Sequence, residues 1–282
     1  MQTLAKASRK RINRLRYNLK MLARRISGEG APRRVVFLHI PKCAGSSVNA
    51  LFKGAIGSSR SDRVELIDDR IASRDLERRI EAARSAQFVG GHFGMDVLEA
   101  VRGDAFVFTV LRDPFDRLRS TYGHFHTRRE GNPLAHKVPH MTIEEYIASE
   151  DPEILQWTDN VIARQLAVSH DRARSLGMEP EIMVERAIGT LARFDTIAML
   201  GTLNRDISAA ASAAGVPYQG AMPEENVTAD RASKRSRQAL SSLDQSLRDL
   251  AMPRVQLDLA VYEAAVRMRS MGPPLQVGTP PQ

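Results

Sequence analysis

The sequence predicts an α/β fold in which a central parallel sheet of about five strands is flanked by helices, with a largely helical C-terminal half. Two observations predict it. Short apolar runs alternate along the chain with stretches of helical periodicity, which is typical of βαβ units. The first run, Val-Val-Phe-Leu-His-Ile at 35–40, is β-branched and aromatic throughout, as expected of a strand buried on both faces.

The same pattern places the other elements in order along the chain. Apolar runs predict strands at 35–40, 64–67, 87–90, 105–111 and 196–200. Helical periodicity is expected at 47–53, 73–86 and 114–129, and almost throughout 142–192 and 234–271. We expect one folded domain over 35–271, preceded by a basic segment at 1–34 and followed by a disordered Pro/Gly-rich tail at 272–282.

Composition excludes several classes of protein. With 282 residues, 43% hydrophobic and 26% charged, the chain matches ordinary globular proteins and not disordered or disulfide-rich ones. Its one cysteine, Cys43, cannot close a disulfide within the chain. No run approaches about 18 apolar residues, and the basic N-terminus lacks the apolar stretch of a secretory signal. We therefore expect a cytoplasmic protein without a transmembrane helix.

The net charge of +8 is unevenly distributed. Residues 1–34 carry 11 Lys/Arg and one acidic residue, whereas the remaining 248 residues carry a net charge of −2. Since the folded part is nearly neutral, the high pI does not indicate a polyanion-binding surface, and we expect no nucleic-acid partner.

The basic segment has the periodicity of an amphipathic helix. Its apolar residues recur at spacings of three and four, with arginines and lysines between them: Ile12, Leu15, Leu19, Leu22 and Ile26. Three interpretations stay open. The helix packs on its own domain or on a second subunit, it acts as a targeting peptide, or residues 1–30 adsorb to an anionic membrane at the inner face.

The first segment whose residues suit ligand binding begins in the first strand. Its sequence at 37–48 is Phe-Leu-His-Ile-Pro-Lys-Cys-Ala-Gly-Ser-Ser-Val. A small-residue turn leads into a helix capped by Ser46 or Ser47, so its P-loop-like start offers backbone N–H groups to a phosphate or sulfate. Lys42 adds a point charge, although an ordinary turn with an exposed lysine stays an alternative. The lysine precedes the loop and the chain has no Gly-Lys-Ser/Thr, which argues against a magnesium–ATP enzyme.

The second segment, 106–122, is Phe-Val-Phe-Thr-Val-Leu-Arg-Asp-Pro-Phe-Asp-Arg-Leu-Arg-Ser-Thr-Tyr. A buried strand delivers Arg112 to the carboxyl edge of the sheet, where ligands bind in open α/β folds. Asp113 is expected to cap the next helix, in which Ser120 can offer a hydroxyl to the same anion. The alternative is that Arg112 only pairs with Asp113 or Asp116.

Together, the two segments closely resemble the signatures of carbohydrate sulfotransferases of the heparan sulfate 2-O-sulfotransferase type, and the resemblance extends over about 35–265. It implies that the donor is 3′-phosphoadenosine 5′-phosphosulfate, that the first segment holds its 5′-phosphosulfate and that Arg112 and Ser120 hold its 3′-phosphate. The first-segment residues are Pro41, Lys42, Cys43, Ala44, Gly45, Ser46 and Ser47. Cys43 departs from the usual threonine, which moves the expected anion contacts toward backbone N–H groups.

The catalytic base is expected at His92. It follows a short strand and two glycines in Phe-Val-Gly-Gly-His-Phe at 88–93, and neutral histidine suits proton transfer near pH 7. Relatives place a catalytic histidine after a similar glycine, although Gly90 stands where some have a second one. A structural or acceptor-positioning role for His92 stays an alternative. His39, inside the first segment, is expected to point into the sheet.

The function that these patterns favour is transfer of a sulfuryl group to a hydroxyl of a carbohydrate or glycolipid, with Lys42 and His92 as the catalytic residues and without a metal ion. A basic run containing Lys234 and Arg235 is either a solvated helix start or, as in many sulfotransferases, a loop closing over the 3′-phosphate. Two other functions stay open: a P-loop-type nucleotide kinase or phosphotransferase, and a non-catalytic nucleotide- or glycan-binding protein.

Overall fold

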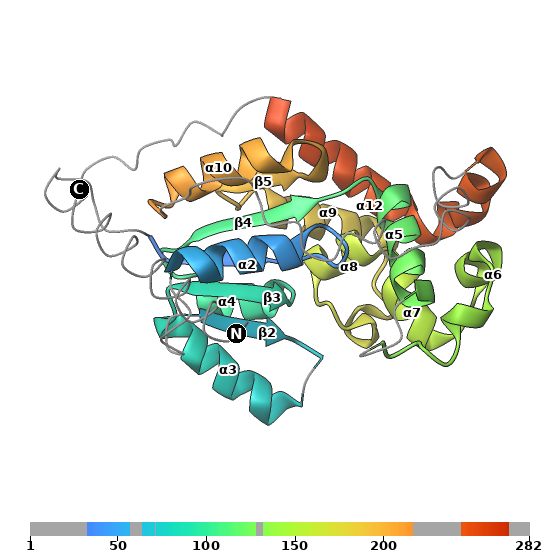
Figure 1. The fold of residues 1–282 in the computed structure, drawn as a ribbon, viewed down its shortest axis with the longest axis horizontal. Helices are drawn as coiled ribbons and strands as arrows, with labels where there is room; N and C mark the ends of the chain where they lie inside the picture. Colours follow the sequence, from blue (N-terminus) through green and yellow to red (C-terminus); the bar gives the residue numbers. More distant parts are fainter. Residues whose placement is uncertain (1–32, 57–63, 71, 128–131, 217–243, 271–282) are drawn as a thin grey trace, which may run out of the picture.

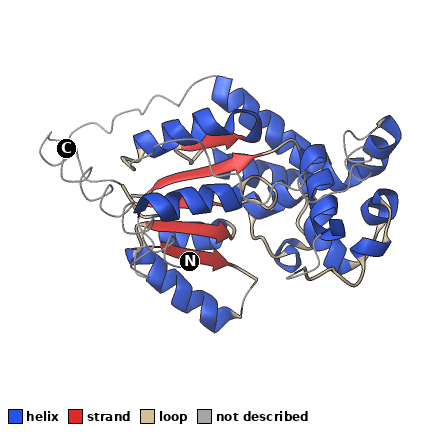
Figure 2. Cartoon of the chain, viewed as in Figure 1, coloured by secondary structure: helices blue, strands red, loops and turns tan. Residues whose placement is uncertain are grey.

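The computed structural model describes residues 33–56, 64–70, 72–127, 132–216 and 244–270. A five-stranded parallel sheet lies at the centre, in the order β2-β3-β1-β4-β5, with helices on both faces (Figures 1 and 2). The strands are β1 Val35–Leu38, β2 Val64–Asp68, β3 Phe88–His92, β4 Phe106–Leu111 and β5 Thr196–Met199. The predicted parallel sheet of about five strands is therefore confirmed.

The helices fall into two groups. One group follows the strands and packs on the sheet, and α2 lies in front of it in Figure 1 with α4 behind. Its members are α2 Gly45–Ile56, α3 Ser73–Ser85, α4 Met95–Arg102 and α10 Leu203–Ala213, whereas α5 Pro114–Thr127 follows β4 but packs against the helical half. The helical C-terminal half contains α6 Ile143–Ala148, α7 Pro152–Thr158, α8 Val161–Ala167, α9 Pro180–Leu191 and α12 Gln245–Ser270. The segments 1–32, 217–243 and 271–282, with the expectations that fall on them, lie outside the described residues.

The sequence predictions were wrong at two places near the sheet. The strand expected to end at residue 90 continues to His92, and α4 follows it where no helix was expected. Gly91 makes the longer strand possible: it has a φ of 145°, and a Cβ there would lie 1.9 Å from the carbonyl oxygen of Ile67 on β2. Only glycine tolerates both that backbone conformation and that approach. The extension carries His92 to the edge of the sheet.

The buried side chains of the described residues form two hydrophobic clusters. The larger surrounds the sheet, where every residue of β1 and β4 is buried. The smaller joins α5 to the helical half through residues such as Phe115, Tyr122, Tyr146 and Val255. Because α5 contributes to this second cluster, the helical half is packed beside the carboxyl end of β4.

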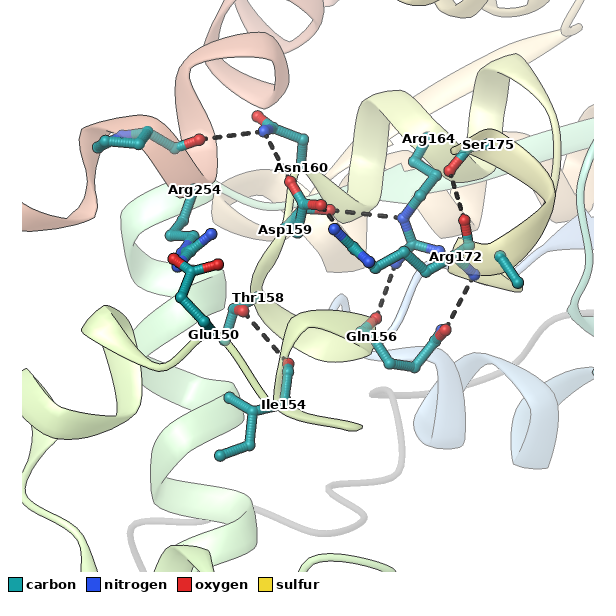
Figure 3. A network of polar contacts seen from close by, with 12 residues as sticks. Glu150, Ile154, Gln156, Thr158, Asp159, Asn160, Arg164, Arg172, Ser175 and Arg254 are labelled. Atoms are coloured by element: carbon teal, nitrogen blue, oxygen red, sulfur yellow. Dashed lines mark hydrogen bonds and ion pairs between the residues drawn. The ribbon is translucent and has the colours of Figure 1, made fainter. Parts of the chain in front are cut away.

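A network of backbone-directed hydrogen bonds fixes the turn between α7 and α8 (Figure 3). The buried guanidinium of Arg164 donates to the carbonyls of Gln156 and His170, at 2.7 Å each. Asn160, with a φ of 41°, donates to the Pro253 carbonyl and accepts from the Leu257 N–H of α12. These contacts hold α8 against α12 and set the position of the chain from 164 to 170, which returns to the sheet edge.

Candidate active site

The loop after β1 has the geometry of an anion-binding concavity. Lys42 and Ala44 both have left-handed backbone conformations, with φ of 67° and 60°. The first intrahelical hydrogen bond of α2 runs from the Val48 N–H to the Ala44 carbonyl, so the N–H groups of Gly45 and Ser46 have no partner within the helix. Alternating conformations of this kind turn successive N–H groups toward one side, where they can bind an anion.

The expected helix cap at Ser46 or Ser47 is wrong by two to three residues, because Ala44 occupies the cap position. The helix begins at Gly45, because the left-handed Ala44 already ends the loop. Ser46 is exposed and Ser47 is buried, both within the first turn. Both serines are therefore residues of the first turn of α2, next in sequence to the loop.

The side chain of Cys43 lies beneath the loop. It is buried, its thiol lies 3.7 Å from the Pro41 carbonyl oxygen, and burial raises its pKa to about 11. A neutral inward-facing thiol adds no donor to the concavity. The departure from threonine at this position thus leaves the loop with its backbone N–H groups, Lys42 and the serines for anion contacts.

Arg112, directly after β4, is joined to this loop. Its Nη1 donates to the Lys42 carbonyl at 3.4 Å, and its buried Nε has no hydrogen-bond partner among the described residues. Burial lowers the pKa of the guanidinium, as desolvation does for any cation. An arginine with an unsatisfied buried N–H beside an anion-binding loop fits an anionic ligand.

The alternative in which Arg112 only pairs with Asp113 or Asp116 is not what the structure shows, because within the described residues Arg112 lies within ion-pair distance of neither carboxylate. The Asp113 carboxylate caps α5 by accepting from the Asp116 N–H at 3.0 Å, and Asp116 pairs with Arg119. The capping prediction for Asp113 is confirmed. Ser120 is half-buried in α5, and within the described structure no hydrogen bond joins it to Arg112 or to the loop. Lys234 and Arg235 lie outside the described residues.

His92 lies at the end of β3, the neighbour of β1. Its Nδ1 is 2.9 Å from the His39 carbonyl oxygen. Because a carbonyl only accepts, Nδ1 carries the proton and Nε2 of the neutral ring presents a lone pair. Burial is the main cause that lowers the pKa of His92, while the His39 carbonyl and Asp68 oppose it. The ring is therefore held neutral near pH 7, as a general base requires.

Two further histidines lie beside His92, and the sequence analysis missed His170. The His39 ring was expected to point into the sheet, and it is buried: it is stacked on Phe37 and lies 4.2 Å from the His92 ring centroid, where Gly45 has no side chain to exclude it. His170 lies on the helical side, 4.9 Å from the His92 centroid. Two residues hold it there: Arg164 donates to its carbonyl, and the distant Asp69 accepts from its N–H. No local sequence signal could therefore have found it.

Strand order sets the arrangement of these groups along the edge. The loop after β1 lies between His92 on β3 and Arg112 after β4, with Asp68 and Arg70 beyond His92 at the end of β2. A neutral histidine, the concave loop and a guanidinium are thus aligned in that order. Within the described ranges no group of three or more His, Cys, Asp or Glu side chains could hold a metal ion. No helix of the described chain is long and apolar enough to cross a membrane.

The buried histidines predict how stability depends on pH. Burial holds the pKa of His39 and of His170 well below the ordinary value of 6.5, and both ring nitrogens of His170 lack partners in the described structure. Below about pH 6.5 the unfolded chain therefore binds protons that the folded chain does not. The free energy of unfolding should fall with decreasing pH by about 1.4 kcal/mol per unit for each such histidine.

Chemical denaturation of His170→Phe between pH 7.5 and 5 measures this effect. The variant keeps the aromatic packing and should lose about 1.4 kcal/mol per pH unit of the slope below pH 6.5. The wild-type protein, measured under the same conditions, supplies the reference slope. An unchanged pH dependence in His170→Phe would show that His170 is protonated in the folded protein.

The comparisons with known proteins agree with this geometry. A family model described as "Sulfotransferase family" matches residues 31–263, which includes every described group of the site. No curated protein matches the chain.

Proposed function

Because this chain belongs to the sulfotransferase family, we propose that it transfers the sulfuryl group of 3′-phosphoadenosine 5′-phosphosulfate to a hydroxyl of a carbohydrate or glycolipid. Membership implies a sulfotransferase with a hydroxyl-bearing acceptor, and the nature of donor and acceptor is our proposal. The observation that carries the donor assignment is the contact between Arg112 and Lys42. It joins two anion-binding groups from neighbouring strands, as a ligand with two separate anionic groups requires.

The residues present fit that donor. The loop from Pro41 to Ser47 offers N–H groups and a lysine to the 5′-phosphosulfate, while Arg112 offers its unsatisfied Nε and its remaining guanidinium N–H groups to the 3′-phosphate. Ser120, on the helix that Arg112 precedes, is proposed to add a hydroxyl. Lys234 and Arg235 are proposed to contact the 3′-phosphate from their own segment.

The proposed reaction uses His92 as the base. Nε2 of His92 takes the proton of the acceptor hydroxyl while its oxygen forms a bond to sulfur and the bond from sulfur to the bridging phosphate oxygen breaks. The resulting imidazolium keeps its Nδ1–H bond to the His39 carbonyl. Lys42 and the loop N–H groups stabilise the charge that develops on the bridging oxygen, because they are already oriented before the reaction. The products are a sulfate ester and adenosine 3′,5′-bisphosphate.

Nucleotide binding tests the donor assignment. Adenosine 3′,5′-bisphosphate should raise the melting temperature more than 5′-AMP at equal concentration, by roughly 5 °C if it binds about a hundred times more tightly. Arg112→Ala should remove the difference between the two nucleotides, whereas Arg84→Ala, an exposed arginine on α3 that pairs with Glu81, should keep it. Equal shifts in the wild-type protein would reject a 3′-phosphate site.

A cytoplasmic location with peripheral attachment to an anionic membrane is proposed on the basis of the pattern in residues 1–30. Deleting this segment should abolish co-sedimentation with vesicles of anionic phospholipid and leave nucleotide-dependent melting unchanged. Binding of the full chain to the vesicles should weaken as salt is raised, because exposed charges are screened over about 10 Å at 0.1 M. Loss of folding upon deletion would favour packing of the segment on the domain instead.

A further inference from the structure

Gln165 lies behind the candidate base and is fully buried in α8. Its side-chain nitrogen donates to two backbone carbonyls, those of His39 and Phe93, at 3.1 Å each. Because both carbonyls can only accept, the orientation of the amide is determined by these contacts. One side chain thus links the segments that leave β1 and β3 at the edge of the sheet.

The two carbonyls are the ones that matter for His92. The His39 carbonyl is the acceptor for His92 Nδ1, so it receives Gln165 Nε2–H and His92 Nδ1–H together. Phe93 directly follows His92 in the chain, so the second hydrogen bond fixes the backbone next to the ring. An amide carbonyl has two lone pairs, and these two donors use both of them.

We propose that Gln165 is a positioning residue that fixes the His39 carbonyl and thereby keeps the His92 proton on Nδ1 and the lone pair on Nε2. A neutral histidine without an acceptor at Nδ1 favours a proton on Nε2, which would leave no lone pair where the acceptor hydroxyl binds. The bond made by one ring nitrogen determines the tautomer at the other. The catalytic importance of this tautomer rests on the proposed function. The tautomer itself follows from the hydrogen bond of His92 and does not depend on the proposed function.

A purely structural role is the alternative, since any buried hydrogen bond between two segments stabilises the fold. Thr109 offers a matched control. It is fully buried in β4, and its hydroxyl donates at 2.8 Å to the carbonyl of Leu38, the residue before His39. Gln165→Met and Thr109→Val each remove a buried donor to the end of β1 while nearly conserving volume. Only the first removes a donor to the His39 carbonyl.

The direct test is the tautomer of His92, observed by long-range ¹H–¹⁵N correlation on protein labelled with ¹⁵N-histidine at pH 7.5. The signals of His92 are assigned by their absence in His92→Gln. Wild type and Thr109→Val should show a protonated Nδ1, and Gln165→Met should shift His92 toward a protonated Nε2. An unchanged His92 pattern in folded Gln165→Met would overturn the proposal. If that variant does not fold, Gln165→Asn serves instead, because its amide is too short to reach both carbonyls.

Kinetics provide a second measurement once an acceptor has been found. Gln165→Met should lower kcat by about 10- to 100-fold, as loss of a partner behind a functional histidine does, with the affinity for adenosine 3′,5′-bisphosphate unchanged. Thr109→Val should leave kcat within about twofold. A loss of kcat of the same size in both variants would favour the structural role. Because the spectroscopic test needs neither donor nor acceptor, failure of the proposed function would not be mistaken for failure of this inference.

Discussion

Replacing His92 with alanine is expected to lower kcat by about 10²- to 10⁴-fold and to leave the affinity for the donor nearly unchanged. The reason is that a base acts in the transition state, and among the described residues the His92 ring is hydrogen-bonded to the His39 carbonyl and not to a group of the anion-binding loop. Isothermal titration with adenosine 3′,5′-bisphosphate and single-turnover kinetics measure the two quantities separately.

Lys42→Ala is the informative comparison for His92→Ala. Lys42 lies in the anion-binding loop and should contribute to donor binding as well as to stabilising the leaving phosphate. Its loss should therefore lower both the affinity for the donor and kcat. If His92→Ala keeps more than about a tenth of the wild-type rate while chemistry limits turnover, another group is the base.

The pH dependence of the wild-type rate adds an independent check on His92. The base must be neutral, so the rate rises with pH through its pKa, and burial lowers that pKa below 6.5. The groups around the ring are His39, His170, Asp68 and Arg70; the hydrogen bond to the His39 carbonyl and the charge of Asp68 raise this pKa, but burial outweighs them. The rising limb should therefore lie below pH 6.5 and disappear in His92→Ala. A limb centred well above pH 7 would contradict the assignment.

Gly45→Ala is expected to reduce donor affinity by at least about tenfold, the second large effect in the site. A Cβ at Gly45 would lie 1.7 Å from His39 Nε2 and within 2.2 Å of two further ring atoms. The His39 ring cannot turn aside easily, because it is stacked on Phe37 on one side and contacts the tilted His92 ring on the other. The loop must therefore move away, and the N–H groups at the start of α2 move with it.

Gly54→Ala is the matched control for this substitution. Gly54 lies in the same helix, and a Cβ there would contact nothing within 4 Å. This variant should bind adenosine 3′,5′-bisphosphate as the wild type does and gain up to about 1 kcal/mol in free energy of unfolding from the better helix former. Wild-type nucleotide affinity in Gly45→Ala would show that the loop does not hold the donor.

The sheet could be predicted from the sequence because each strand carries a local signal. Runs such as Val-Val-Phe-Leu at 35–38 are buried on both faces, and a run of consecutive apolar residues predicts such burial directly. The same holds for Asp113, whose cap depends on residues three positions away. Arg112 was found in the same way, since its place at the sheet edge follows from the end of its strand.

The parts that could not be predicted depend on contacts between distant residues. His39 has no local signal for its orientation, because its ring occupies space that Gly45 leaves open on the next helix. Gln165 reaches the site only because α8 packs behind the sheet, 126 positions along the chain from the carbonyl it contacts. The continuation of β3 past two glycines likewise depends on the close approach of β2 at Ile67.

The central claim is tested most directly by incubating the protein with ³⁵S-labelled 3′-phosphoadenosine 5′-phosphosulfate and fractionated cellular glycans and glycolipids, with excess chelator present. We predict that the label enters a glycan or glycolipid fraction, that an equal amount of adenosine 3′,5′-bisphosphate is released, and that His92→Ala abolishes both. Donor binding without label in any fraction, or transfer that the chelator abolishes, would contradict the account.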